Sequence, residues 1–210
     1  MKLAVLSESS ADEAALRVLI DGILRRQTER VSLPPLRTRG WPSVREILPT
    51  ILKHLHYQSD AEALVLVVDS NHSPPHEFAH DQPGGVSIEC RLCQLRQVTE
   101  QVRRQLTPVP NRAPLKLAIG LAVPAIEAWY RVGRDPQVSE AAWTVGLHTG
   151  VFPYSKNELK RAVYGTDRPP LPIEEARALQ EADRLAANPG LLEEKFSVGF
   201  GTLAREVRAW

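Results

Sequence analysis

The hydrophobic pattern of the chain alternates between short apolar runs and longer segments in which apolar residues recur at helical spacing. Residues 2–7 and 63–68 are short, mostly apolar runs, and a third run covers residues 115–123. Runs of this length without polar alternation are typical of strands that are buried on both faces of a parallel sheet. The pattern therefore predicts three buried strands.

Helical periodicity fills the intervals between these runs. Residues 43–56 carry an apolar stripe, and Pro49 predicts a kink there because proline removes an intrahelical hydrogen bond. Ser155 and Glu158 form a capping-box pattern, which predicts a further helix start. The other segments with helical periodicity are residues 16–24, 88–106, 125–132, 173–187 and 201–210.

Prolines set two further expectations. A second strand at Val31–Leu36 is restricted to a sheet edge or a loop, because Pro34 and Pro35 cannot donate ladder hydrogen bonds. Pro124 suits the first position of a helix, where its missing N–H would have no partner. Glu127 would then lie in the first turn of that helix.

The order of these segments predicts an α/β fold of the Rossmann-like type, with a parallel sheet flanked by helices. Strands and helices alternate up to about residue 135, and only helices and loops follow. We therefore expect an α/β core at residues 1–135 and a helical extension at residues 136–210 that packs on it as one compact unit.

Composition narrows the function classes. The 26 basic and 25 acidic residues leave a net charge of +1, so only a local patch could attract nucleic acid. The N-terminal apolar run is too short for a signal peptide, and no segment has the ~18 apolar residues of a membrane helix. With only two cysteines, these features predict a cytoplasmic protein. The spacings of a nucleophile elbow, a phosphate-binding loop and a dinucleotide fingerprint do not occur.

Acidic residues follow the predicted strands. Glu8, Asp69 and Glu127 each come directly after a strand or in the following first turn, where ligands bind in open parallel sheets. Carboxylates brought together repel one another unless a cation compensates, and Mg²⁺ or Mn²⁺ prefers such oxygens. Asn71 could add an amide oxygen, and Asp12 could act in the same site.

A simpler interpretation of these acids stays open. Carboxylates in the first turn of a helix are favoured by the helix dipole, which would explain Asp12 and Glu127 without a metal. Asp69-Ser70-Asn71 is also ordinary turn chemistry. Spacing alone does not choose between the two interpretations.

Several motifs resemble those of TOPRIM-like proteins. In their order along the chain, they are most similar to DUF4276, a family of bacterial TOPRIM-like proteins, and distantly similar to the TOPRIM domains of OLD-type nucleases. The motifs are LSESSADE at residues 6–13, VVDSN at 67–71, AVPAIEAW at 122–129, SKNELK at 155–160 and FSVGFGTL at 196–203.

The resemblance implies Mg²⁺-dependent phosphoryl transfer, as in a nuclease or phosphotransferase that acts in DNA repair or phage defence beside a partner ATPase. It implies that Glu8 lies near the scissile phosphate, that Asp69 is the principal metal ligand and that Glu127 completes the acidic cluster. Two departures are evident, because Ser9 replaces a glycine and Asn71 replaces an aspartate. The alternative is therefore a catalytically inactive TOPRIM-like binding module in a complex.

Basic residues near position 160 could contact the substrate. Lys156, Lys160 and Arg161 could bind phosphate oxygens of a nucleic acid. The alternative is a charged helix face that is only solvated.

A second kind of metal site is also conceivable. His72, His76 and His80 precede Cys90 and Cys93, and zinc prefers these ligand types. Both cysteines could instead be core residues, because residues three apart share one face of a helix. The candidate zinc ligands are His76, His80, Cys90 and Cys93.

Overall fold

A parallel sheet forms the centre of the protein. The structure, a computed structural model, describes residues 1–34 and 40–210. Within this part of the chain four strands pair in the order β2-β1-β3-β4, all parallel. The first six residues of β3 are buried, as expected for a strand covered on both faces. The strands are β1 (Lys2–Leu6), β2 (Glu29–Arg30), β3 (Ala63–Asp69) and β4 (Lys116–Ala122).

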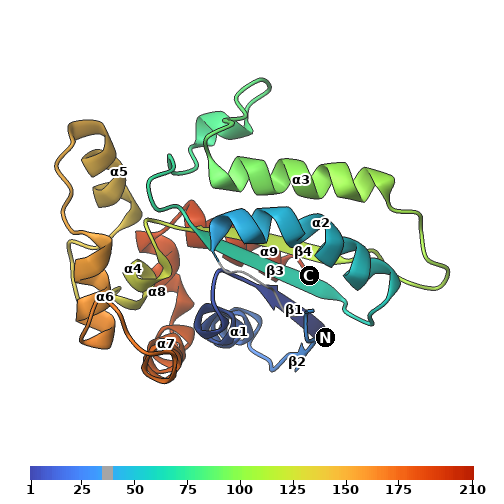
Figure 1. The fold of residues 1–210 in the computed structure, drawn as a ribbon, viewed down its shortest axis with the longest axis horizontal. Helices are drawn as coiled ribbons and strands as arrows, with labels where there is room; N and C mark the ends of the chain where they lie inside the picture. Colours follow the sequence, from blue (N-terminus) through green and yellow to red (C-terminus); the bar gives the residue numbers. More distant parts are fainter. Residues whose placement is uncertain (35–39) are drawn as a thin grey trace.

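Helices cover both faces of the sheet. Helices α2 and α3 lie on one face, α1 and α9 lie on the other, and α7 packs outside α1 (Figure 1). Helices α4, α5 and α6 gather beyond the carboxyl ends of the strands. The helices are α1 (Ser10–Leu24), α2 (Trp41–Tyr57), the 3₁₀ helix η1 (Phe78–Asp81), α3 (Arg91–Gln105), α4 (Ile126–Tyr130), α5 (Glu140–Thr149), α6 (Lys156–Tyr164), α7 (Leu171–Ala186), α8 (Pro189–Lys195) and α9 (Gly199–Arg208).

The predicted α/β class is confirmed, and the three buried strands lie where the apolar runs predicted them. The edge strand is different. It is Glu29–Arg30, two exposed residues held beside β1 by backbone hydrogen bonds, so no apolar pattern marks it. Residues 31–34 of the predicted strand Val31–Leu36 have no strand structure, and residues 35 and 36 lie outside the described residues.

Two prolines bear on the sequence-based expectations. The predicted helix is present and includes Pro49, and the kink expected there stays a prediction. Pro124 is not the first residue of α4, because the helix begins at Ile126, and Pro124 follows a cis peptide bond in the preceding loop. The Pro124 carbonyl accepts a hydrogen bond from Asn71 N–H at 2.7 Å, which ties this loop to the end of β3. Glu127 does lie in the first turn of α4.

The C-terminal helices pack closely on the sheet and on α1. A Cβ atom at Gly120 of β4 would lie 3.2 Å from the Leu203 side chain of α9, so this side chain packs directly against the β4 backbone. Glu206 of α9 accepts a hydrogen bond from Ile119 N–H at 2.9 Å and so satisfies a donor on the outer edge of β4. The division near residue 135 stays a prediction. Across residues 1–34 and 40–210, no helix combines the length and the apolar character needed to cross a membrane.

Candidate functional site

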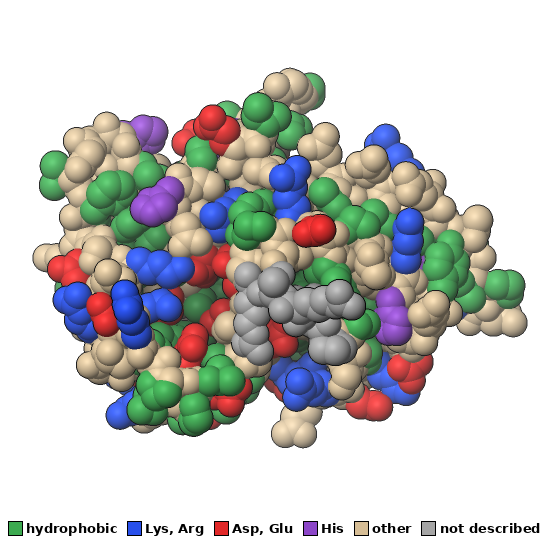
Figure 2. Space-filling view, viewed as in Figure 1, with side chains coloured by type: hydrophobic (Ala, Val, Ile, Leu, Met, Phe, Trp, Pro, Cys, Tyr) green, Lys and Arg blue, Asp and Glu red, His purple; other side chains and the backbone are tan. Residues whose placement is uncertain are grey.

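Acidic residues from three segments meet at the carboxyl ends of the strands. Glu8 follows β1, Asp69 is the last residue of β3, and Glu127 lies in α4, just after β4. Parallel strands finish at the same edge of a sheet, which brings these segments together. In the view of Figure 2, acidic side chains lie in a recess of the molecular surface, with Lys and Arg side chains along its border.

Asp69 is the centre of this acidic site. Its side-chain Oδ1 accepts a hydrogen bond from Ile126 N–H at 3.0 Å, at the start of α4. Its own N–H donates to Glu8 Oε1 at 3.0 Å, and its carbonyl oxygen accepts from Arg91 Nη1 at 2.6 Å. Asp69 therefore links the loop after β1, the start of α3 and the start of α4.

Lysines from α6 bind the acidic residues. Lys156 Nζ donates to Asp69 Oδ2 and to Asn71 Oδ1, both at 2.7 Å. Lys160 Nζ lies 3.7 Å from Glu127 Oε1. Burial is the largest single influence on Lys156 and lowers its pKa, but the charge and hydrogen bond of Asp69 together with the charges of Glu127 and Glu8 outweigh burial, so the pKa is raised on balance. The Lys156 ammonium thus occupies the position between two oxygens that a bound cation would also use.

Arg161, the third basic residue suggested by the sequence, is placed differently. Its guanidinium pairs with Asp167 Oδ2 at 3.5 Å, and more than half of its side chain is exposed. The phosphate-binding role of Arg161 stays a prediction, whereas Lys156 and Lys160 contact the acidic residues.

Burial and repulsion from neighbouring carboxylates raise the pKa values of Glu8, Asp12 and Glu127. The pKa of Glu8 is raised by burial and then by the charge of Asp69. Burial and the charge of Asp69 also raise the pKa of Glu127 to about 7. Burial and the charges of Asp69 and Glu127 raise the pKa of Asp12 well above its usual range. Glu127 is only 3% exposed, and its Oε2 has no hydrogen-bond partner among the described residues. An additional cation would relieve both the repulsion and the unpaired oxygen.

Two cavities reach the acidic site. One, of about 360 Å³, has Asn71 and Lys156 on one side and aromatic walls from Trp143, Phe152 and Tyr154. Sequence reasoning missed this cavity, although three aromatic residues within a dozen positions just before Lys156 were a visible signal. A larger cavity of about 680 Å³ opens between α1, β2 and α7, and its lining includes Glu8, Ser9, Arg17, Arg30 and Glu175.

The suggested zinc ligands also come together. One ligand atom from each of His76, His80, Cys90 and Cys93 lies within 4.8 Å of the others, so these four residues could hold a metal ion. His76, Cys90 and Cys93 are buried. His72 is exposed and is not part of this group.

The two groups offer different chemistry. The acidic site supplies carboxylate and amide oxygens suited to a hard divalent cation, together with lysines suited to phosphate. The other group supplies sulfur and imidazole nitrogen, which suit zinc. Comparison with protein-family models, curated proteins and solved structures finds no match for this chain.

Proposed function

We propose that the protein is a Mg²⁺-dependent, TOPRIM-like enzyme that acts on phosphodiester bonds of nucleic acid, as a nuclease or phosphotransferase. The observation that carries this proposal is the meeting of Glu8, Asp69 and Glu127 at one end of a parallel sheet, next to two lysines. The resemblance of the motifs to TOPRIM-like proteins supports the same assignment. A role in DNA repair or phage defence with a partner ATPase follows from that resemblance alone.

The donor set fits Mg²⁺ or Mn²⁺. Glu127 Oε2 is a buried oxygen without a partner in the described chain, and burial together with neighbouring carboxylates disfavours the charged form of Glu8 and Asp12. A divalent cation would be held by Glu8, Asp69, Asn71 and Glu127, with Asp12 nearby. When bound, such a cation polarises a phosphate and lowers the pKa of a bound water.

The side chains around the acidic site would bind and orient the substrate. Lys156 and Lys160 would donate to phosphate oxygens once a cation takes over the neutralisation of Asp69 and Glu127. The resemblance to TOPRIM-like proteins assigns Glu8 to proton transfer near the scissile bond. Its carboxylate is held by the Asp69 N–H and lies 3.7 Å from Arg91. The aromatic cavity beside Lys156 would receive a base of the nucleic acid.

The test combines metal titration with cleavage of single-stranded and double-stranded DNA and RNA. Asp69→Asn keeps an oxygen for Ile126 N–H but removes the charge, and we expect at least tenfold weaker Mg²⁺ binding and loss of cleavage. Asp183→Asn is the matched control, because Asp183 is an exposed acid on α7. Cleavage that persists without divalent metal, or undiminished in Asp69→Asn, contradicts the proposal.

One observation favours a second candidate function. Lys156 already neutralises Asp69 and contacts Asn71, which stands where the family pattern has a second aspartate. With that ammonium fixed, the protein would be an inactive binding module that recognises nucleic acid or a partner such as an ATPase. Saturable nucleic-acid binding that needs no Mg²⁺, without turnover, would support this function and exclude the first.

A further inference from the structure

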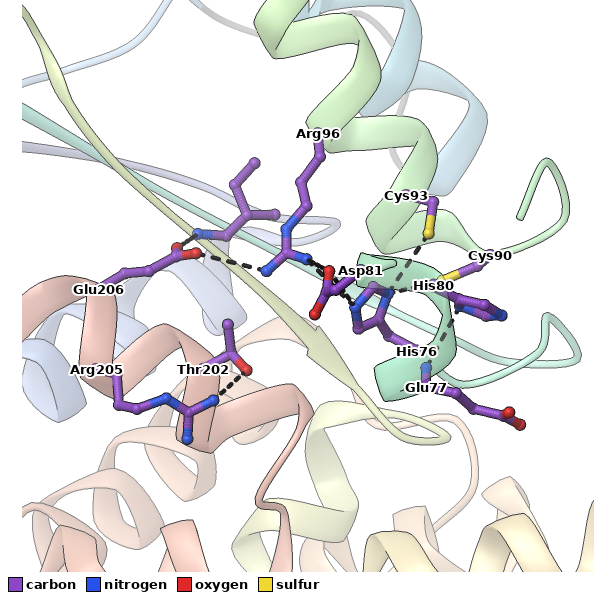
Figure 3. Close-up of polar contacts among 11 residues, drawn as sticks. His76, Glu77, His80, Asp81, Cys90, Cys93, Arg96, Thr202, Arg205 and Glu206 are labelled. Atoms are coloured by element: carbon purple, nitrogen blue, oxygen red, sulfur yellow. Dashed lines mark hydrogen bonds and ion pairs between the residues drawn. The ribbon is translucent and has the colours of Figure 1, made fainter. Parts of the chain in front are cut away.

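The loop that follows β3 returns to the start of α3 through a compact group of histidine and cysteine side chains. His76 lies in the loop, His80 in η1, Cys90 directly before α3 and Cys93 in its first turn (Figure 3). Cys90 is fully buried, and Cys93 and His76 are each 4% exposed. This group is separate from the acidic site, so a role for it is independent of the proposed function.

The distances match a tetrahedral metal site. His76 Nδ1 lies 3.7 Å from Cys90 Sγ and 3.5 Å from Cys93 Sγ. In a tetrahedral zinc site with Zn–S near 2.3 Å and Zn–N near 2.05 Å, sulfur and nitrogen are about 3.6 Å apart. The ligand atoms of all four residues lie within 4.8 Å of one another. The site is therefore arranged close to the spacing that zinc needs.

Hydrogen bonds among His76, Cys90 and Cys93 explain their positions less well than a bound cation does. The Nδ1 atom of a neutral histidine has one lone pair, whereas both thiols point at it. His76 Nε2 lies 3.1 Å from Asp81 Oδ1, which places the ring proton on Nε2 and leaves a lone pair on Nδ1. Because one lone pair accepts one hydrogen bond, Nδ1 cannot satisfy both buried thiols. A cation shared by both sulfurs and Nδ1 satisfies all three atoms.

The surroundings of His76 are those of a metal-bound histidine. A metal-ligating histidine commonly donates its second ring N–H to a carboxylate, which fixes its tautomer. Asp81 takes this role and is itself held by Arg96 Nη1 at 2.8 Å. Arg96 Nη2 in turn is 3.6 Å from Glu206 of α9. These contacts hold the ring orientation from three elements.

His80 is held less firmly. Glu77 N–H approaches its Nδ1 at 3.4 Å, which is long for a hydrogen bond. The ring can therefore turn a nitrogen toward a metal at little cost.

We propose that His76, His80, Cys90 and Cys93 bind one structural Zn²⁺ ion. All four positions are filled by protein ligands, so the ion would stabilise the fold and would leave no open position for a substrate. It would fasten the loop and η1 to α3. Arg91, next to Cys90, donates to the Asp69 carbonyl, so the ion would also fix α3 against the acidic site.

The test is the zinc content of the full chain, purified under reducing conditions without added metal. We expect one zinc per chain, and we expect Co²⁺ substitution to give the intense visible absorption of tetrahedral cobalt with a thiolate charge-transfer band. Cys90→Ser combined with Cys93→Ser should weaken zinc binding at least 100-fold. His72→Ala and Asp69→Asn are the matched controls, and both should keep the metal.

A second readout does not depend on the variants folding. Removal of metal from the wild-type chain with a chelator should increase protease cleavage between Ser73 and Glu89 at least tenfold, and Zn²⁺ but not Mg²⁺ should reverse this. Less than half an equivalent of zinc in reduced wild-type protein, together with a weak octahedral cobalt spectrum, overturns the proposal. Undiminished zinc binding by the double serine variant overturns it as well.

Discussion

Replacing Lys156 with methionine tests whether its ammonium holds the position of a divalent cation. Lys156 Nζ lies 2.7 Å from both Asp69 Oδ2 and Asn71 Oδ1, and Mg²⁺ bound to these oxygens must displace it. A hydrogen bond to a charged group contributes about 1.5–3 kcal/mol. About a third of the Lys156 side chain is exposed, so solvent screening favours the lower end, about 1.5 kcal/mol. That energy corresponds to a roughly tenfold gain in Mg²⁺ affinity.

Calorimetric titration of wild-type protein and Lys156→Met with Mg²⁺ measures this gain directly. Methionine keeps much of the aliphatic length of lysine, so the packing of α6 changes little. The same variant should cleave nucleic acid more slowly at saturating Mg²⁺, because the phosphate loses a donor. Lys53→Met, at an exposed position of α2, should change neither quantity. Unchanged or weaker Mg²⁺ binding by Lys156→Met refutes the reasoning.

Two further predictions concern stability. Burial raises the pKa of Glu140 to about 7, so the folded state keeps a proton that the unfolded state loses from about pH 4.5 upward. The free energy of unfolding should therefore fall by up to about 3 kcal/mol as pH rises from 4.5 to 7. Urea titrations at several pH values should show this decrease in the wild-type protein and a smaller decrease in Glu140→Gln. Equal decreases in the two proteins contradict the prediction. A Cβ atom at Gly199 would lie 2.1 Å from the Leu121 carbonyl oxygen, so Gly199→Ala should cost about 3 kcal/mol in thermal unfolding. Gly190→Ala, in α8 with nothing closer than 3.5 Å, should instead stabilise by about 0.5–1 kcal/mol, and similar melting temperatures for the two variants contradict this.

The sequence predicted the parts of the fold that local patterns encode. Buried strands show as apolar runs because both of their faces are covered, and this places Asp69 at the end of β3. The edge strand Glu29–Arg30 has no such pattern, because backbone pairing with β1 alone defines it.

The sequence could not place contacts that depend on tertiary packing. Lys156 and Asp69 are 87 positions apart, and no periodicity relates them. Glu140 is a buried acid that accepts hydrogen bonds from Val198 and Gly199 at the start of α9, although charged residues are usually expected at the surface. The spacing of the histidines and cysteines suggested ligands, but only the return of the loop to α3 places them together.

The most direct test of the acidic site is a crystal structure of the protein soaked in Mn²⁺, with the anomalous signal of manganese measured. We expect an anomalous peak about 2.1 Å from Asp69 Oδ2, with contacts to Glu8 or Glu127 oxygens and with Lys156 moved away from Asp69. A structure in which Lys156 still bonds Asp69 and Asn71, with no manganese between the acidic side chains, would contradict the metal-dependent function.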